Sequence, residues 1–112
     1  MPNYNHTTFL GRITADPELR KTKGGTSVTT FCVVANDRFK NAAGELVEEP
    51  TFLDCELFGR GAEVFAEHMR KGRHILVTGR LRNDRWEKDG KAMSKIVLKV
   101  GDFSFIDKPV EE

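Results

Sequence analysis

Hydrophobic and polar residues alternate with a period of two along most of the chain, which is the spacing of β-strands with one buried face. This alternation predicts five strands, over residues 4–14, 26–38, 51–60, 73–86 and 92–106. One segment has helical spacing instead, because its apolar residues recur at i, i+3, i+4 and i+7. These are Ala62, Phe65, Ala66 and Met69. The pattern therefore predicts an all-β chain with one short helix between the third and fourth strands.

Polar connections separate the expected strands. Asp16-Pro17 ends the first strand, and a polar connection follows over residues 18–25. Residues 39–50 are polar and acidic and contain several turn-forming residues, so they predict a long hairpin loop.

Three glycine-containing positions add detail to the expected strands and helix. Asp89-Gly90 favours a tight turn, which places Trp86 near the tip of a hairpin. Gly11 indicates a bulge or bend in the first strand, and Gly72 indicates the C-cap of the helix.

The third expected strand has an unusual polar face. Its apolar face consists of Leu53, Cys55 and Leu57. Its other face carries two charges and two phenyl rings, on Phe52, Asp54, Glu56 and Phe58. Rings on a charged face favour a ligand with stackable rings, and nucleic-acid bases are the commonest such ligand. Packing of Phe52 and Phe58 beneath a loop is the alternative.

The second expected strand is apolar on both faces in its middle. Val28, Cys32 and Val34 lie on one side, and Phe31, Val33 and Ala35 lie on the other. Such a strand needs a core on one side and a second cover on the other. A second subunit is one candidate for that cover.

Five strands with a helix between the third and fourth are typical of the OB-fold. This fold is a small, partly open Greek-key barrel whose face and loops bind oligonucleotides or oligosaccharides. An SH3-like barrel also has five strands but has no helix at that position. The predicted fold class is thus a five-stranded OB-fold Greek-key barrel.

Composition and length agree with one soluble domain. The chain has 112 residues, of which 38% are hydrophobic and 31% charged. No apolar run approaches the roughly 18 residues of a membrane span, and the start MPNYNHTTF lacks the pattern of a secretory signal. The two cysteines, Cys32 and Cys55, have no metal-site spacing and are expected as small buried thiols in a reducing compartment. A disulfide or metal site at these residues is the less favoured alternative.

The net charge of +1 hides a segregation of charge along the chain. Residues 70–91 contain eight basic and three acidic side chains, whereas residues 41–69 contain seven acidic side chains and Arg60 alone. A nearly neutral chain of this kind can present a basic surface after folding. An ordinary mixed surface is the alternative.

Motifs for catalysis are sparse. The three histidines lie on different expected elements without metal-ligand spacing, and no phosphate-binding glycine loop or nucleophile elbow occurs. Asp54 and Glu56 could mimic a carboxylate pair of a metal-dependent hydrolase, but two solvated charges are the simpler interpretation. No catalytic residue, metal site or cofactor is expected.

Aromatic residues interleaved with cations indicate single-strand binding instead. The four rings in polar contexts are Phe39, Phe52, Phe58 and Trp86. Their basic neighbours in sequence are Arg38, Lys40, Arg60, Arg82 and Arg85. Rings stack with bases at about 1–3 kcal/mol each, and cations follow the phosphates. The remaining phenylalanines are expected in the core or an interface; they are Phe9, Phe31, Phe65, Phe103 and Phe105.

Four segments in order resemble the bacterial single-stranded DNA-binding protein family, over nearly the whole chain from Phe9 to Ile106. The segments are FLGRITADPELR, GTSVTTFCVVAND, FLDCELFGRGAEVFAEHMRKG and VTGRLRNDRWEKDGK. The resemblance implies an OB-fold domain over residues 1–106, usually a homotetramer. It also implies sequence-independent coating of single-stranded DNA in replication, recombination and repair, with no catalysis and no cofactor, in the nucleoid-associated cytoplasm of a bacterium or in a phage.

The resemblance also assigns roles to individual residues. The base-stacking positions of the family fall on Phe39, Phe52, Phe58 and Trp86. Its phosphate-contacting positions fall on Arg20, Arg60, Lys71, Arg82 and Arg85.

The chain departs from the family pattern in two places. Long-tailed members end in an acidic tip that recruits replication and repair proteins, whereas residues 107–112 form a short acidic end without it, which puts such recruitment in doubt. Asp54 and Glu56 place negative charge between two stacking positions and are expected to weaken phosphate attraction there. A protein–protein interaction domain that keeps only part of the DNA face is the alternative function.

Overall fold

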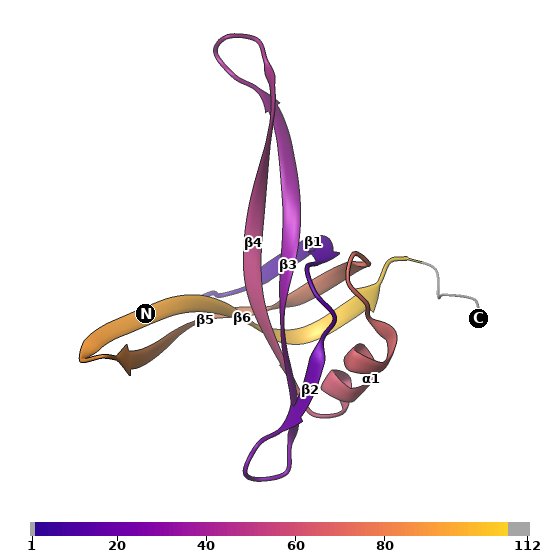
Figure 1. Cartoon of the computed structure of the whole chain (residues 1–112), viewed down its shortest axis with the longest axis vertical. Helices are drawn as coiled ribbons and strands as arrows, with labels where there is room; N and C mark the ends of the chain where they lie inside the picture. The colour runs from indigo at the N-terminus through magenta and orange to yellow at the C-terminus, as the bar shows by residue number, and fades with distance from the viewer. Residues whose placement is uncertain (1, 108–112) are drawn as a thin grey trace.

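Six strands and one helix make up residues 2–107, the part of the chain that this computed structural model describes (Figure 1). The elements are β1 (Thr7–Ile13), β2 (Glu18–Lys21), β3 (Ser27–Lys40), β4 (Leu46–Phe58), α1 (Arg60–His68), β5 (His74–Lys88) and β6 (Lys91–Phe105). The predicted strands and the predicted helix all occur, and the helix stands between the third and fourth strands of the barrel.

Five of the strands close into a barrel. The sheet runs in the order β1-β5-β6-β4-β3-β2, and an additional pairing between β1 and β3 closes it. The β4–β6 pairing is parallel and the others are antiparallel. The predicted five-stranded barrel is confirmed, with β2 as an extra strand at the edge of β3.

The barrel is filled by one apolar cluster that α1 caps. Phe65 of the helix is fully buried and stacks on Phe31 of β3, with ring centroids 4.1 Å apart. Its edge meets Phe103 of β6 at a centroid distance of 5.6 Å. Cys55 and Leu57 of β4 are buried in the same cluster, as the alternation of that strand predicts.

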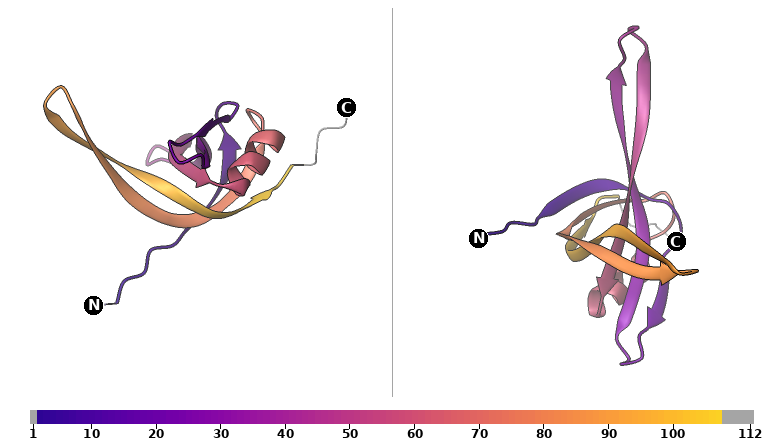
Figure 2. Two further views of the ribbon diagram at one scale, coloured as in Figure 1. Left: turned by 90° about the horizontal axis from the view of Figure 1, so that it is seen from below. Right: turned by 90° about the vertical axis from the view of Figure 1, so that its left-hand side faces the viewer.

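Two hairpins extend beyond the barrel as arms (Figures 1 and 2). We call residues 35–40 with 46–51 the β3–β4 arm, and residues 82–88 with 91–97 the β5–β6 arm; both are paired throughout. The β5–β6 arm ends in the predicted tight turn, where Asp89 and Gly90 have φ angles of 51° and 76°. Both arms project from the barrel, so side chains on them can meet a ligand that also contacts the barrel.

Two segments predicted to be loops are partly or mostly β-strand. The expected loop over residues 39–50 is mostly strand, because β3 continues to Lys40 and β4 begins at Leu46, which leaves a five-residue connection. The expected polar connection over residues 18–25 contains β2, which pairs with Ser27–Thr30 of β3. Both segments are polar because they are exposed strands, and polarity alone does not distinguish an exposed ribbon from a loop.

Two predicted glycine roles also differ from the structure. Gly11 lies in an uninterrupted β1–β5 ladder rather than in a bulge. A β-carbon there would lie 2.2 Å from the carbonyl oxygen of Val34, so glycine is needed where β1 meets β3 to close the barrel. Gly72 has a φ angle of 88° but lies in the turn after the helix, whose C-cap is Met69.

The bulge occurs instead between β5 and β6. The register shifts between Thr78 and Gly79, which leaves Gly101 of β6 unpaired. A β-carbon on Gly79 would lie 2.0 Å from the carbonyl oxygen of Lys99, so only glycine allows this close approach. Bulges bend and twist a strand pair. This one lies within the barrel, where Gly79 still pairs with β1, three residues before the β5–β6 arm begins at Arg82.

No helix within residues 2–107 is long and apolar enough to cross a membrane. The predicted acidic end at residues 107–112 lies outside the described part of the chain except for Asp107. Asp107 is held by the backbone N–H of His74, which donates to Oδ2 over 2.6 Å.

Candidate nucleic-acid interface

Phe58 lies in a row of side chains that crosses three strands. Arg20 of β2 pairs with Val28 of β3, which pairs with Phe58 of β4. Directly paired residues share a face of a sheet, so Arg20 and Phe58 flank Val28 on the outside of the barrel. Arg20 also donates a 3.4 Å hydrogen bond to Thr30 Oγ1, which lies on that same face. We call this face, which carries Phe52 and Phe58, the outer face.

Phe52 lies in a second row of the same kind. Arg12 of β1 pairs with Val34 of β3, which pairs with Phe52 of β4. Arg12 is exposed and points away from the core, since its neighbours Gly11 and Ile13 are buried. Arg12 is therefore a cation beside a candidate stacking ring that the sequence alone did not indicate, because only the β1–β3 register brings it there.

The four candidate stacking rings all lie outside the core, as predicted. Phe52 is 62% exposed, Phe58 49%, Phe39 43% and Trp86 41%. By contrast, Phe31 and Phe65 are buried, Phe9 and Phe103 pack against the core, and Phe105 is partly exposed against Phe103 and His68. The split between exposed and core rings follows the polarity of their sequence neighbours except at Phe105, which is 38% exposed and does not lie in the core.

Phe39 lies on the β3–β4 arm and Trp86 lies on the β5–β6 arm. Phe39 pairs with Val47 on the β3–β4 arm, and strand alternation puts it on the ribbon face opposite to that of Phe52. Trp86 pairs with Met93 near the tip of the β5–β6 arm. The four rings are thus spread over the barrel and both arms rather than gathered in one pocket.

A hollow on the β5–β6 arm brings one ring and several cations together. It is lined by Arg82, Asn83, Asp84, Arg85, Trp86 and Lys95. A smaller hollow lies where the outer face of β3–β4 meets the base of this arm, and its lining includes Cys32, Asp54, Glu56 and Lys95. The ring of Trp86 and the outer face are therefore connected by a hollowed, partly charged surface.

The other predicted cations are exposed but differ in position. Arg60 is the first residue of α1 and follows Phe58 directly in the chain after Gly59. Arg38 lies on the β3–β4 arm, 3.8 Å from the carboxylate of Glu48, and Lys40 ends that strand. Lys71 lies apart, in the turn after α1, where its backbone N–H donates to Asp16. The structure does not bring Lys71 together with the rings.

The two acids between Phe52 and Phe58 each have a basic partner on β6. Glu56 forms an ion pair with Lys99, and Asp54 lies 3.9 Å from the ammonium of Lys95. These lysines are 43 and 41 residues further along the chain, so sequence neighbours give no sign of the pairing. The negative charge that the sequence places between Phe52 and Phe58 is therefore largely offset in the folded chain.

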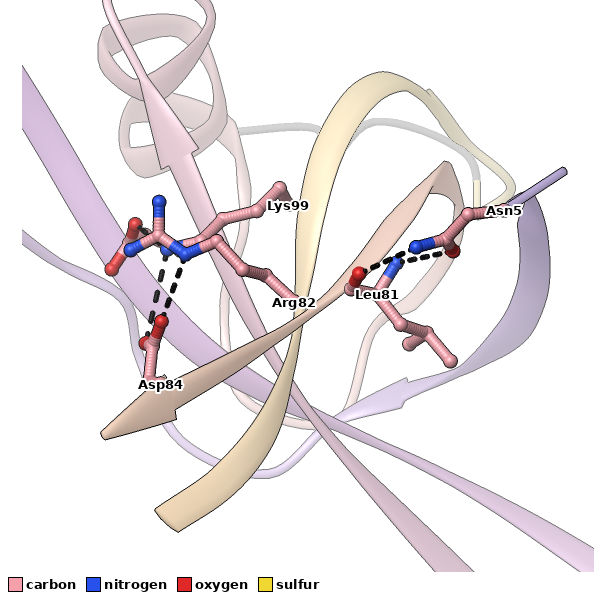
Figure 3. A network of polar contacts seen from close by, with 6 residues as sticks. Asn5, Leu81, Arg82, Asp84 and Lys99 are labelled. Atoms are coloured by element: carbon pink, nitrogen blue, oxygen red, sulfur yellow. Dashed lines mark hydrogen bonds and ion pairs between the residues drawn. The ribbon is translucent and has the colours of Figure 1, made fainter. Parts of the chain in front are cut away.

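Asp84 of β5 contacts Lys99 as well as Arg82 (Figure 3). It accepts a 2.9 Å hydrogen bond from Nε of Arg82 and lies 3.8 Å from the ammonium of Lys99. The hydrogen bond from Arg82, helped by the charge of Lys99, lowers the pKa of Asp84 below its ordinary value. Asp84 is thus an acidic partner shared by Arg82 and Lys99.

The surroundings of both thiols favour their protonated form. Burial raises the pKa of Cys55 to about 12, and burial together with the charge of Asp54 raises the pKa of Cys32. Cys32 is only half-buried, so the prediction of two buried cysteines holds for Cys55 alone. Both cysteines are unpaired, and no group of three or more metal-ligating side chains occurs among residues 2–107.

Comparison with known proteins agrees with this geometry. The model of the single-strand binding protein family matches residues 4–106. The single-stranded DNA-binding protein of Aquifex aeolicus is 38% identical over 105 residues, which cover 94% of this chain and 71% of the relative. That of Treponema pallidum is 40% identical over 98 residues, which cover 88% of this chain and 55% of the relative.

Two solved structures share the fold. A deletion mutant of the single-stranded DNA-binding protein from Thermus aquaticus superposes with a TM-score of 0.81 at 31% identity, over 93% of this chain and 51% of that one. The Plasmodium falciparum SSB in complex with ssDNA superposes with a TM-score of 0.88 at 20% identity, over 96% and 98% of the two chains. The chain spans between 39% and 71% of the length of six bacterial relatives that each match at least 88% of its residues.

Proposed function

We propose that this chain, which belongs to the single-strand binding protein family, binds single-stranded DNA on its outer face and arms without strict sequence preference. One observation carries the proposal. Phe52 and Phe58 are 62% and 49% exposed on the outer face. The strand register places one arginine in the same row as each ring, Arg12 with Phe52 and Arg20 with Phe58. Every base has a flat π-face, so such rings accept any sequence, while the arginines attract the phosphates.

The proposed binding residues extend from this face along both arms. Phe39, Phe52, Phe58 and Trp86 would stack with bases. Arg12, Arg20, Arg38, Lys40, Arg60, Lys71, Arg82 and Arg85 would attract phosphates, with Lys71 the most distant from the rings. A strand that contacts all four rings must cross the barrel and both arms, which favours binding along a path over insertion into a single pocket.

Salt dependence tests this proposal. Binding of fluorescein-labelled oligo-dT, measured by fluorescence anisotropy, is expected to weaken as salt increases, with a log–log slope of roughly −0.7 for each phosphate neutralised. A duplex of the same length serves as the control and is expected to bind much more weakly, because its bases cannot stack on the rings. Equal affinity for the duplex, or no binding at low salt, would contradict the proposal.

We further propose that the chain works as a homo-oligomer, a tetramer by analogy with the family. The β1 edge supports this, because β1 pairs with β3 only at Arg12 and Ile13 in the described chain and leaves the edge over Thr7–Gly11 open. Leu10 on this strand is 50% exposed. An open edge with exposed apolar side chains is a ready site for pairing with a second copy.

Light scattering of the purified protein tests the oligomer. We expect a mass that is a multiple of the 12.7 kDa chain, with four copies for the tetramer. A proline in place of Thr8 would remove a backbone donor from the β1 strand and is expected to disturb assembly. A wild-type protein that stays monomeric at micromolar concentration would rule out this proposal.

The remaining proposals follow from family membership. We propose that the chain acts by binding alone, without catalysis or a cofactor, in replication, recombination and repair in the cytoplasm of a bacterium or of a phage-infected cell. Labelled oligo-dT should therefore stay intact when incubated with the protein and divalent metal ions. We also propose that residues 1–106 form the DNA-binding unit, which a deletion of residues 107–112 should leave able to bind.

A further inference from the structure

Lys99 is the most enclosed cation of the outer face. Its side chain is only 13% exposed, and the carboxylate of Glu56, with which it forms an ion pair, is 16% exposed. Asp84 lies 3.8 Å from the same ammonium and is 25% exposed. The other lysine of this face with an acidic partner, Lys95, is 53% exposed and lies 3.9 Å from Asp54. Lys99 and Lys95 thus lie on the same strand and face, but the side chain of Lys99 is enclosed and that of Lys95 is exposed to solvent.

The register of β4 and β6 brings Lys99 to one side of Phe58. Glu56 pairs directly with Lys99 in the parallel β4–β6 ladder, and Phe58 follows two residues later on the same face of β4. The ammonium of Lys99 lies over the Phe58 ring, 5.9 Å from its centroid. A cation at this distance is attracted to the face of the ring. Phe58 remains 49% exposed, so about half of the residue is open to a ligand.

An enclosed cation with two acidic partners is a poor phosphate contact. For a phosphate to reach Lys99, the ion pair with Glu56 would have to open and leave a carboxylate unpaired at a site with little solvent, which is costly. The charges around Lys99 are also already balanced, because Glu56 and Asp84 together offset Lys99 and Arg82. Lys99 should therefore neither attract phosphates nor release salt ions when DNA binds.

We propose that Lys99 is a positioning residue for base stacking, held by Glu56 and Asp84 so that it supports one face of the Phe58 ring and leaves the other face for a base. This inference rests on the proposed function and deepens it. It assigns Glu56 a role in the site, because the acid between the two rings fixes the cation that supports one of them. It also separates Lys99 from Lys95 on the same strand, since Lys95 is 53% exposed and can meet a phosphate.

The proposal predicts a specific pattern in salt titrations. The paired variant Glu56→Gln with Lys99→Gln removes one charge of each sign and keeps similar side-chain volumes. We expect it to weaken oligo-dT binding by roughly two- to tenfold at every salt concentration, because the lost support is a cation–π contact and not a phosphate contact. The slope of log affinity against log salt should stay unchanged. Lys99→Arg, which keeps the charge and the ion pairs, should bind nearly as the wild type does.

Lys95→Gln is the matched control on the same strand. Because Lys95 is exposed, this variant should make the salt slope shallower by roughly 0.7 and lose its effect at high salt. The paired variant should also have little further effect when combined with Phe58→Ala, since the ring that it supports is then gone. A shallower slope for the paired variant, or full additivity with Phe58→Ala, would overturn the proposal.

Nuclear magnetic resonance of the unmodified protein provides a second test that does not depend on the folding of variants. The ammonium resonance of Lys99 should retain its coupling to Glu56 when oligo-dT is added at saturation. Transfer of this contact from Glu56 to a DNA phosphate would refute the positioning role. Wild-type binding is measured first, so a failure of the proposed function is recognised as an absence of binding in the unmodified protein.

Discussion

Phe52→Ala and Phe58→Ala are each expected to weaken oligo-dT binding by roughly 5- to 150-fold, the range that corresponds to the 1–3 kcal/mol found for one base stacked on one aromatic ring. Both rings are about half-exposed or more, so their removal takes little apolar surface out of the core. The free energy of unfolding should change by less than about 1 kcal/mol. Fluorescence anisotropy measures the affinity, and urea denaturation measures the stability.

The double variant sharpens this expectation. Phe52 and Phe58 lie six residues apart on β4 and do not share a row of the sheet, so each should stack with a different base. Their effects on binding free energy should therefore add to a first approximation. If either single variant unfolds the domain, that ring belongs to the core and not to the binding face.

Phe65→Ala is expected to lower the free energy of unfolding by about 3–5 kcal/mol, the usual cost of deleting a fully buried ring. Phe65 is 0% exposed, stacks on Phe31 and meets Phe103 edge-on, so its loss leaves a cavity between α1 and the barrel. A domain of this size has a total stability of about 5–15 kcal/mol, so the variant should be partly unfolded or close to it. Urea denaturation followed by circular dichroism measures the change.

Phe58→Ala is the matched control, because it removes the same ring from the outside of the same barrel. Phe65→Ala should reduce stability strongly and leave the affinity of the remaining folded protein close to wild type. Phe58→Ala should have the reverse profile. Similar stability losses in the two variants would mean that the assignment of rings to core and binding face is wrong.

Much of the fold follows from local sequence pattern. The period-two alternation of the third predicted strand places Cys55 and Leu57 inside and Phe52 and Phe58 outside, as the structure confirms. The helical spacing of residues 62–69 finds α1, because only one face of that segment is apolar. These features depend on residues within a few positions of each other, where sequence spacing and spatial spacing are linked.

The lengths of the arms could not be predicted in the same way. An arm that projects from a barrel is exposed to solvent on both faces. Its residues are therefore mostly polar, and its sequence resembles that of a loop. This is why the segment from Phe39 to Pro50 suggests a loop although most of it is paired. The edge strand β2 was missed for the same reason, since all four of its residues are exposed.

The electrostatic partners of the site also lie beyond the reach of local pattern. Whether Asp54 and Glu56 repel phosphates depends on which cations face them, and the register of β6 decides that. Arg12 reaches the row of Phe52 only through the closure of β1 on β3. The candidate rings could be chosen from the sequence, but the balance of charge around them required the folded chain.

The fluorescence of Trp86 during titration with oligo-dT tests the central claim most directly. Trp86 is the sole tryptophan of the chain and lies 41% exposed on the β5–β6 arm, so its emission reports on one known place. Stacking of a base on this ring predicts strong, saturable quenching that is lost as salt is increased. Unchanged emission together with the absence of a gel shift at low salt would contradict single-strand binding by this chain.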